Sequence, residues 1–423
     1  MRRRRVALLG LLAAGLLAAQ AVLPAAAAPR LETGFRRGVG IHTMLNWARL
    51  DRGDPGRYAE APFEGPAYAL PEATLRNVRA AGFDFVRLTV DPGPFLQAEG
   101  APREALDRLL VATVRRFLAA GLAVMVNFHD NSQVSRFESV NWLRSPEEPV
   151  FKAYLALVRR TAGLLAGLGS AGVAFEPINE PGYGYDGAST RRWQAMCEML
   201  HAAVRAAAPD LLVVLTGAQG GNRHGLVALD PAPFRASRVR YSFHAYEPYP
   251  FTHQGVVSKQ ESARAWRYFS DLPYPPASVP LPMVLDQVRA NVEADATLAP
   301  LERRRMVAEA RAQAAAYVAA GFDRRGIARA FDEVLDWARR NGVRPDQIVL
   351  GEFGATRTYG RYRASDPLSY ETWLRDMREA AEQRGFAWSF WALGGHGGMA
   401  LVSEDGATTL DRTSLRALGL SAE

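Results

Sequence analysis

The sequence predicts an α/β fold, a (β/α)8 TIM barrel made of one domain with a long insertion between strands six and seven. Three observations favour this fold. The chain has 423 residues, of which 48% are hydrophobic and 22% charged, which is enough to bury a large core. Short apolar segments alternate with amphipathic segments over most of its length. Polar residues gather at the carboxyl ends of the apolar segments, the face at which such barrels carry their functional side chains.

The amino-terminal segment is typical of a secretory signal peptide. Residues 2–5 are all arginine, residues 6–22 are almost entirely apolar, and residues 25–28 are alanines that suit cleavage. An uncleaved anchor helix is the alternative, because the apolar run approaches membrane-spanning length. We predict that residues 1–28 are removed and that residues 29–423 form a secreted or periplasmic bacterial protein with no stable membrane span.

Charge argues against a nucleic-acid-binding protein, and the cysteine content excludes a fold stabilised by an intrachain disulfide. The formal net charge is +7, but without the four arginines of residues 2–5 the 51 basic residues fall to 47 against 44 acidic ones. A mature charge of about +3 is poor evidence for a nucleic-acid partner, and we predict none. Cys197 is the sole cysteine, so a disulfide within the chain is impossible and a buried structural thiol is expected.

Eight segments have the composition of buried parallel strands. They are residues 38–44, 83–90, 123–130, 172–181, 211–217, 239–246, 347–354 and 387–393. Pro71 opens a helix that ends near Gly82, and Pro102 opens another that ends near Gly121. A doubly wound open sheet is the second candidate fold. It is disfavoured because no G-x-G-x-x-G follows the first strand.

One βα unit is oversized, with roughly a hundred residues between the sixth and seventh strands. We predict an insertion at about 247–345. Residues 247–282 are rich in Pro, Tyr and Phe and indicate an ordered loop, while residues 300–320 and 326–341 indicate two amphipathic helices. The aromatic content favours a wall of a binding cleft over packing decoration.

Two glutamates supply the carboxyl pair that glycoside hydrolysis needs. Glu180 ends the fourth strand and Glu352 the seventh, and these strands face each other across a barrel. One group has to stay protonated to donate to the leaving oxygen, while the other stays ionised to attack the anomeric carbon. A retaining enzyme holds the two groups about 5 Å apart, which long side chains on opposite strand ends can reach.

Six motifs, in order, resemble glycoside hydrolase family 5, the cellulase-like retaining β-glycosidases of clan A. They are VRLTV (86–90), VNFHD (126–130), FEPINEP (175–181), FHAY (243–246), VLGEFG (349–354) and FWAL (390–393). The N-E-P triplet is a weak signal by itself. Six motifs at predicted strand ends are a strong one, and the resemblance covers essentially the whole mature chain.

The resemblance implies a role for each matched residue. Glu180 is the expected acid/base, and Glu352 is the expected nucleophile that forms a glycosyl-enzyme. Asn179 is expected to bind the 2-hydroxyl of the sugar. Arg87 is expected to hold Glu352 ionised, and Tyr246 is expected to donate to Glu352.

Three further matches imply supporting roles. His244 is expected to tune Glu180, His129 to line the subsite of the reacting sugar, and Trp391 to be its stacking platform. Both histidines have an alternative reading as satisfied core residues. Trp388 is the alternative platform, although alternation along a strand puts it on the face opposite to Trp391.

Other polar residues near the strand ends have weaker cases. Glu176 and Asp130 are expected to give hydrogen-bonding support, and His42, Asn46 and Trp47 to line the cleft. Five residues could in principle surround a divalent ion, namely His42, His129, Asp130, Glu180 and His244. No H-x-H or H-E-x-x-H spacing occurs, and Arg87 would oppose a cation, so we predict neither a catalytic metal nor a cofactor.

We therefore expect a monomeric retaining endo-β-glycoside hydrolase that cleaves β-1,4-glucan or a related β-linked polysaccharide or oligosaccharide. The resemblance supports the reaction better than the substrate. The open alternatives are trimming of a bacterial exopolysaccharide, β-mannanase or β-1,3-glucanase activity, transglycosylation, and a non-catalytic carbohydrate-binding barrel. The last would be expected to lack one carboxylate or its supporting Arg and Tyr, and all of these are present.

Overall fold

The computed structural model describes residues 34–169, 171–360, 362–394, 398–402 and 408–421. The proposed signal peptide, residues 1–28, lies outside the described residues. Within the described ranges, no helix is both long and apolar enough to cross a bilayer.

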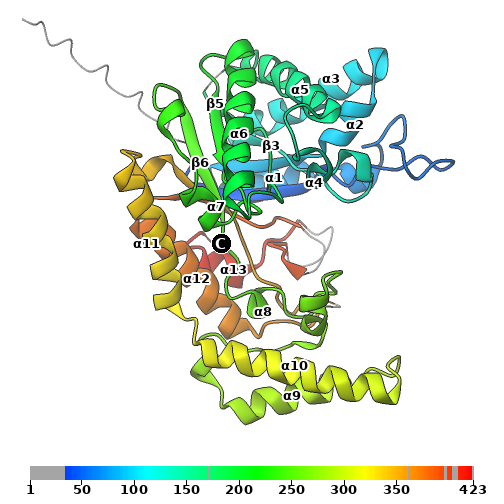
Figure 1. Cartoon of the computed structure of the whole chain (residues 1–423), viewed down its shortest axis with the longest axis vertical. Helices are drawn as coiled ribbons and strands as arrows, with labels where there is room; N and C mark the ends of the chain where they lie inside the picture. Colours follow the sequence, from blue (N-terminus) through cyan, green and yellow to red (C-terminus); the bar gives the residue numbers. More distant parts are fainter. Residues whose placement is uncertain (1–33, 170, 361, 395–397, 403–407, 422–423) are drawn as a thin grey trace, which may run out of the picture. The chain divides into compact units, whose positions relative to one another are not determined.

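Eight parallel strands close into a barrel in sequence order, and β8 pairs with β1 to complete it (Figure 1). The strands are β1 (Arg37–Leu45), β2 (Phe85–Val90), β3 (Ala123–Phe128), β4 (Val173–Glu176), β5 (Leu212–Thr216), β6 (Val239–His244), β7 (Ile348–Phe353) and β8 (Ala387–Phe390). The predicted (β/α)8 fold is confirmed. The largest difference is at β4, which ends at Glu176 because Pro177 has no amide hydrogen for the ladder.

Helices alternate with the strands, and those of the βα units lie outside the barrel, whereas α9 and α10 form a separate pair (Figure 1). They are α1 (Glu72–Ala81), α2 (Pro92–Gln97), α3 (Gly100–Ala119), α4 (Ser139–Trp142), α5 (Pro149–Ala166), α6 (Gly187–Ala207), α7 (Arg223–Val227), α8 (Tyr249–Thr252), α9 (Leu281–Glu293), α10 (Pro300–Ala320), α11 (Arg324–Arg340), α12 (Pro367–Gln383) and α13 (Arg412–Ala417). As predicted, α1 ends near Gly82, which follows its last residue and adopts a left-handed conformation with φ of 106°. Helix α3 begins two residues before the predicted Pro102.

The barrel interior changes from apolar to polar along the strands, and this change positions the site. Alternate residues of each strand point inward. A small apolar cluster that includes Phe85, Met125 and Val349 fills the amino-terminal part of the interior. Arg87, which is fully buried, occupies the next inward position of β2 after Phe85. The large core lies outside, between strands and helices, and includes Cys197, where burial raises the pKa of the thiol to about 12.

The long unit between β6 and β7 contains one helix of the barrel and one added layer. Helix α11 is the barrel helix, because Phe331 packs on Phe243 of β6 and Trp337 on Tyr241. The added layer is the loop region 247–280 and the helix pair α9 and α10, which pack against each other (Figure 1). Helices α10 and α11 match the prediction. Helix α9 was not predicted, because its prolines suggest a loop, whereas proline is well tolerated in the first turn of a helix.

Candidate active site

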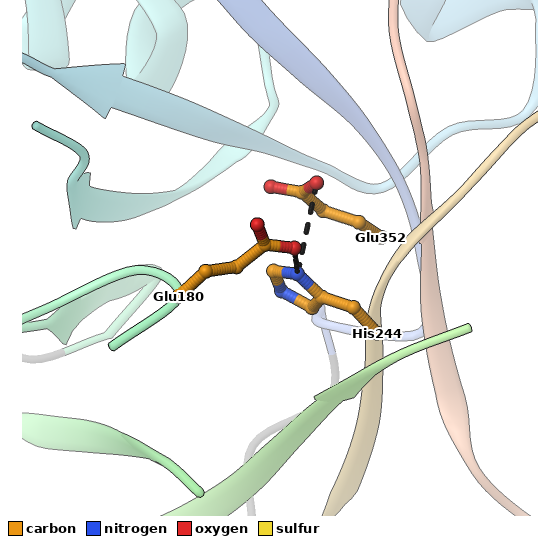
Figure 2. A group of neighbouring side chains, drawn as sticks. All are labelled: Glu180, His244 and Glu352. Atoms are coloured by element: carbon orange, nitrogen blue, oxygen red, sulfur yellow. Dashed lines mark hydrogen bonds and ion pairs between the residues drawn. The ribbon is translucent and has the colours of Figure 1, made fainter. Parts of the chain in front are cut away.

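Glu180, His244 and Glu352 point toward one another at the carboxyl end of the barrel (Figure 2). Glu180 lies four residues beyond β4, His244 ends β6, and Glu352 lies in β7. One carboxylate oxygen of each glutamate and one ring nitrogen of His244 lie within 4.8 Å of one another. The two carboxyl groups that the sequence placed on opposite strands therefore meet.

Arg87 is the charged centre beneath this group. Its guanidinium donates to Glu352 Oε1 at 2.6 Å, to Glu176 Oε2 at 2.7 Å and to Asn179 Oδ1 at 2.7 Å. Burial by itself lowers the pKa of Arg87, but the charges of Glu176 and Glu352 outweigh it and raise the pKa above its usual range. Arg87 is thus a permanent cation that fixes two carboxylates and one amide by charge-assisted hydrogen bonds. Arg87 lies within β2, three residues before its end at Val90.

Tyr246 holds the second oxygen of Glu352. Its hydroxyl donates to Glu352 Oε2 at 2.8 Å. Burial and the neighbouring charge of Glu352 raise the pKa of Tyr246 well above its usual value, so the phenol stays a donor. Glu352 is therefore held at both oxygens, and 5% of its side chain is exposed.

His244 connects the two glutamates. Its Nδ1 lies 2.6 Å from Glu180 Oε1 and 3.6 Å from Glu352 Oε2. Burial lowers the pKa of His244, but the charge of Glu352 and the hydrogen bond to Glu180 outweigh it and raise the pKa above its usual value. Gly351 makes room for this ring, because a Cβ there would meet Ser242 Oγ and lie 3.0 Å from His244 Nε2. In contrast to Glu352, Glu180 has a side chain that is 39% exposed.

Asn179 and His129 form the neighbouring wall. Because Asn179 Oδ1 accepts from Arg87, its Nδ2 faces His129 Nε2 at 3.3 Å and donates to it. The hydrogen of the His129 ring then sits on Nδ1, which donates to Asn127 Oδ1 at 3.3 Å. Burial, His42 and Arg87 lower the pKa of His129 well below its usual value. His129 is therefore a neutral hydrogen-bonding residue.

Trp391 adjoins His129 in this wall. Its ring stacks on His129, with centroids 5.6 Å apart and an angle of 13°, and meets the edge of His42 at 4.6 Å. Trp388 is fully buried outside the barrel, 6.2 Å from Phe83, and is not on this face. Trp391 is thus the tryptophan of β8 and its loop that lies at the site.

The structure connects the predicted site residues to one another. Their contacts link Arg87, His129, Asn179, Glu180, His244, Tyr246, Glu352 and Trp391. Glu176 joins them through Arg87, whereas Asp130 accepts a hydrogen bond from the Ser139 amide at the start of α4. Thr216 was missed. It donates to Glu176 Oε1 at 3.0 Å, and its position as the polar end of β5 could have identified it.

Among the described residues, Glu180, His244 and Glu352 are the group whose spacing would suit a metal ion. The chemistry of these donors opposes one. Both oxygens of Glu352 already accept from Arg87 and Tyr246, and the Arg87 cation lies 2.6 Å from one of them. The arrangement therefore favours a pair of carboxyl groups over a metal centre.

Removing the Arg87 charge is expected to destabilise the fold strongly. Arg87→Met leaves two buried carboxylates without their counter-ion, which costs about 3–5 kcal/mol in the free energy of unfolding. Chemical denaturation measures this loss. Arg108→Met is the control, because the Arg108–Glu104 pair has side chains 71% and 62% exposed, and such pairs contribute about 0–1 kcal/mol. Equal stability of the two variants would contradict the central role of Arg87.

Known proteins match parts of this chain and its fold. The family model described as Cellulase (glycosyl hydrolase family 5) matches residues 59–276, about half of the chain. Cellodextrinase A of Ruminococcus flavefaciens is 27% identical over 191 residues, which is 44% of this chain and 54% of the relative. The chain thus spans about half the length of that curated relative.

Two solved structures share the fold at low identity. Cellulose synthase subunit Z of Clostridioides difficile is 21% identical, with a TM-score of 0.61 over 91% of this chain and 99% of that one. The Cel5A protein of Thermotoga maritima in complex with cellobiose is 20% identical, with a TM-score of 0.62 over 91% and 97% of the two chains.

Proposed function

Because the chain belongs to glycosyl hydrolase family 5, we propose that it is a retaining β-glycoside hydrolase that uses Glu352 and Glu180. The observation that carries this proposal is the distance between the two carboxyl groups. One oxygen of Glu180 and one oxygen of Glu352 lie within 4.8 Å of each other. Retaining glycosidases hold these groups about 5–5.5 Å apart, whereas inverting enzymes need about 6.5–9.5 Å to admit a water molecule.

The surroundings of the two glutamates support different roles for them. Glu352 is buried, and the hydrogen bonds from Arg87 and Tyr246 stabilise a negative charge on it, as a nucleophile requires. Glu180 is the more exposed of the two and shares a short contact with His244. It suits the acid/base, which has to exchange protons with the leaving group and with water.

The reaction proceeds in two displacements. Glu352 attacks the anomeric carbon while Glu180 gives its proton to the glycosidic oxygen, so the C–O bond breaks and a glycosyl-enzyme forms. Water then loses a proton to Glu180 and attacks the same carbon, which releases the sugar and frees Glu352 with net retention. Asn179 is oriented by Arg87 and His129 to bind the 2-hydroxyl, and Trp391 offers a flat apolar face to the sugar ring.

We propose a β-1,4-glucan or a related soluble β-linked chain as the substrate, attacked at internal bonds. A cellodextrinase among the relatives and a Thermotoga maritima Cel5A complex with cellobiose support it. Two alternatives have support of their own. The same Cel5A was also solved with a mannotriose substrate, which supports β-mannan. The similar fold of a cellulose synthase subunit supports a polysaccharide that the producing cell itself makes.

Product analysis on soluble polysaccharides tests this function. We expect the wild type to release short oligosaccharides and lower the viscosity of one member of a panel of carboxymethylcellulose, mixed-linkage β-glucan, β-1,3-glucan and β-mannan. Glu352→Ala, prepared in the same way, should release none. Release from β-mannan alone would change the assigned substrate from β-1,4-glucan to β-mannan. No release from any member, under conditions where the protein is folded, would contradict hydrolysis of these β-glycans.

We also propose export with cleavage after residue 28. Expression of the full chain in a bacterial host should yield an extracytoplasmic protein whose mature terminus, read by mass spectrometry, is near Pro29. A terminus at Met1 would contradict cleavage and support the anchor alternative.

A further inference from the structure

The first turn of the insertion is joined by buried hydrogen bonds to the loop that leaves β7. Thr252 and Gln254, both fully buried, lie on the insertion side, and Thr356 and Ser365 lie on the other. The backbone amide and the hydroxyl of Thr356 both donate to the Thr252 carbonyl, at 2.9 Å and 3.0 Å. We call these four residues the β7 clamp.

Gln254 closes the clamp. Its Nε2 donates to Ser365 Oγ and to the Phe251 carbonyl, both at 2.9 Å, while its Oε1 accepts from the Leu272 amide at 3.0 Å. The Thr356 hydroxyl also approaches the Gln254 carbonyl at 2.8 Å. Since Thr356 is four residues beyond Glu352 in the chain, the clamp ties the insertion to the strand of the nucleophile.

Thr252 extends the clamp to the catalytic site. Its hydroxyl donates to the Tyr246 carbonyl at 2.6 Å, and the hydroxyl of Tyr246 donates to Glu352. His253 Nδ1 lies 2.9 Å from the Thr252 hydroxyl, and burial lowers the pKa of His253 to about 4, so this ring is neutral. The Thr252 hydroxyl therefore links the β7 clamp to Tyr246, the residue that donates to Glu352.

Tyr246 needs this support because it lies beyond the sheet. Strand β6 ends at His244, and the Ala245 amide, which donates to the Glu352 carbonyl at 3.0 Å, is the next backbone contact to β7. The Tyr246 carbonyl instead accepts from a side chain of the insertion. A small rotation of this peptide moves the phenol away from Glu352, and errors of about 1 Å in such positions can cost roughly 10²-fold in rate.

We infer that Thr252 is a positioning residue that sets Tyr246 against Glu352, so that the insertion is part of the catalytic framework. This inference rests on the proposed function. Thr252 touches neither of the glutamates in the contacts described, and it acts through the Tyr246 backbone.

Thr252→Val removes the hydroxyl and keeps the shape of the side chain, and Thr252→Ser keeps the hydroxyl. We expect Thr252→Val to lower kcat about 10-fold with KM nearly unchanged, and Thr252→Ser to stay near wild type. Thr161→Val is the matched control, because Thr161 is fully buried on α5 and its hydroxyl has no hydrogen-bond partner in the part of the chain that the structure describes. It should leave kcat unchanged.

A double-mutant cycle separates positioning from general destabilisation. In a Tyr246→Phe background, Thr252→Val should lower kcat less than about 2-fold, because the hydroxyl that Thr252 positions is already gone. An equal loss in both backgrounds, or an unchanged kcat in Thr252→Val alone, would overturn the inference.

Crystal structures of the wild type and Thr252→Val give a readout that needs no activity. We expect the Tyr246–Glu352 hydrogen bond to be lengthened or lost in the variant, and an unchanged bond would overturn the inference. An inactive wild type would refute the proposed function by itself, and the two structures would then still decide the role of Thr252. A variant that melts at the wild-type temperature excludes misfolding as the cause.

Discussion

Replacing Glu352 by alanine is expected to lower kcat by roughly 10⁴-fold or more, because the covalent intermediate can no longer form. The fold should persist, since Arg87 keeps Glu176 and Asn179 as partners when Glu352 is shortened. The loss therefore belongs to chemistry, and the affinity for an oligosaccharide, measured by calorimetry, should change much less than kcat. Glu147→Ala is the control, because Glu147 is a surface residue with a side chain 79% exposed.

Azide identifies the face that Glu352 occupies. With an activated aryl β-glycoside, azide can enter the space left by the carboxylate of Glu352→Ala and attack from that side. The product is then an α-glycosyl azide, with inverted configuration, and nuclear magnetic resonance of the product shows it. Residual activity above about 1% that survives repeated purification would show that another group is the nucleophile.

The positions of the strands could be predicted from sequence because burial on both faces leaves a local record. Residues 123–126 and 348–350, for example, are all apolar, as expected for parallel strands covered by helices. The ends of these segments also indicated the site, since a barrel brings all carboxyl ends of its strands to one face. This rule is sufficient to predict that Asn179, Glu180 and His244 lie at the site.

The hydrogen-bond network could not be predicted, because it depends on the register in which the barrel closes. Arg87 pairs with Gly40 of β1 and Met125 of β3, and this register turns its guanidinium toward Glu176 and Glu352. Nothing in the local sequence around Arg87 records these distant partners. The position of Thr216 at the end of β5 marks it as a candidate, but it does not indicate that its hydroxyl donates to Glu176 on the adjacent strand.

The structure of the insertion is harder to predict from the sequence, because it depends on contacts between residues that are far apart in the chain. Helix α9 carries prolines at its start, which are compatible with a loop as well as with the first turn of a helix, and it packs along α10. Thr252 resembles any loop threonine in the sequence. Its importance follows from a carbonyl two residues beyond β6 that requires a donor.

Replacing Glu180 by alanine is expected to slow the reaction in a way that depends on the leaving group. General acid catalysis contributes about 10²–10⁴-fold, so kcat/KM should fall by that amount on a polysaccharide, whose sugar alkoxide needs a proton to leave. On an aryl glycoside with an acidic phenol the fall in kcat/KM should be small, because that phenolate leaves without a proton. The limb of the pH–rate profile that reports the acid/base should vanish in the variant.

Azide provides the matching test for Glu180. In Glu180→Ala the glycosyl-enzyme on Glu352 still forms from the activated substrate, and azide needs no general base to attack it. The rate of turnover should therefore rise with azide, and the product should be a β-glycosyl azide, with retained configuration. Since Glu352→Ala is expected to give the α-product, the two variants control for each other. An α-product from Glu180→Ala would reverse the two assignments. An equal fall of kcat/KM on both substrates would refute the acid/base role of Glu180, because loss of the general acid matters only for a leaving group that needs a proton.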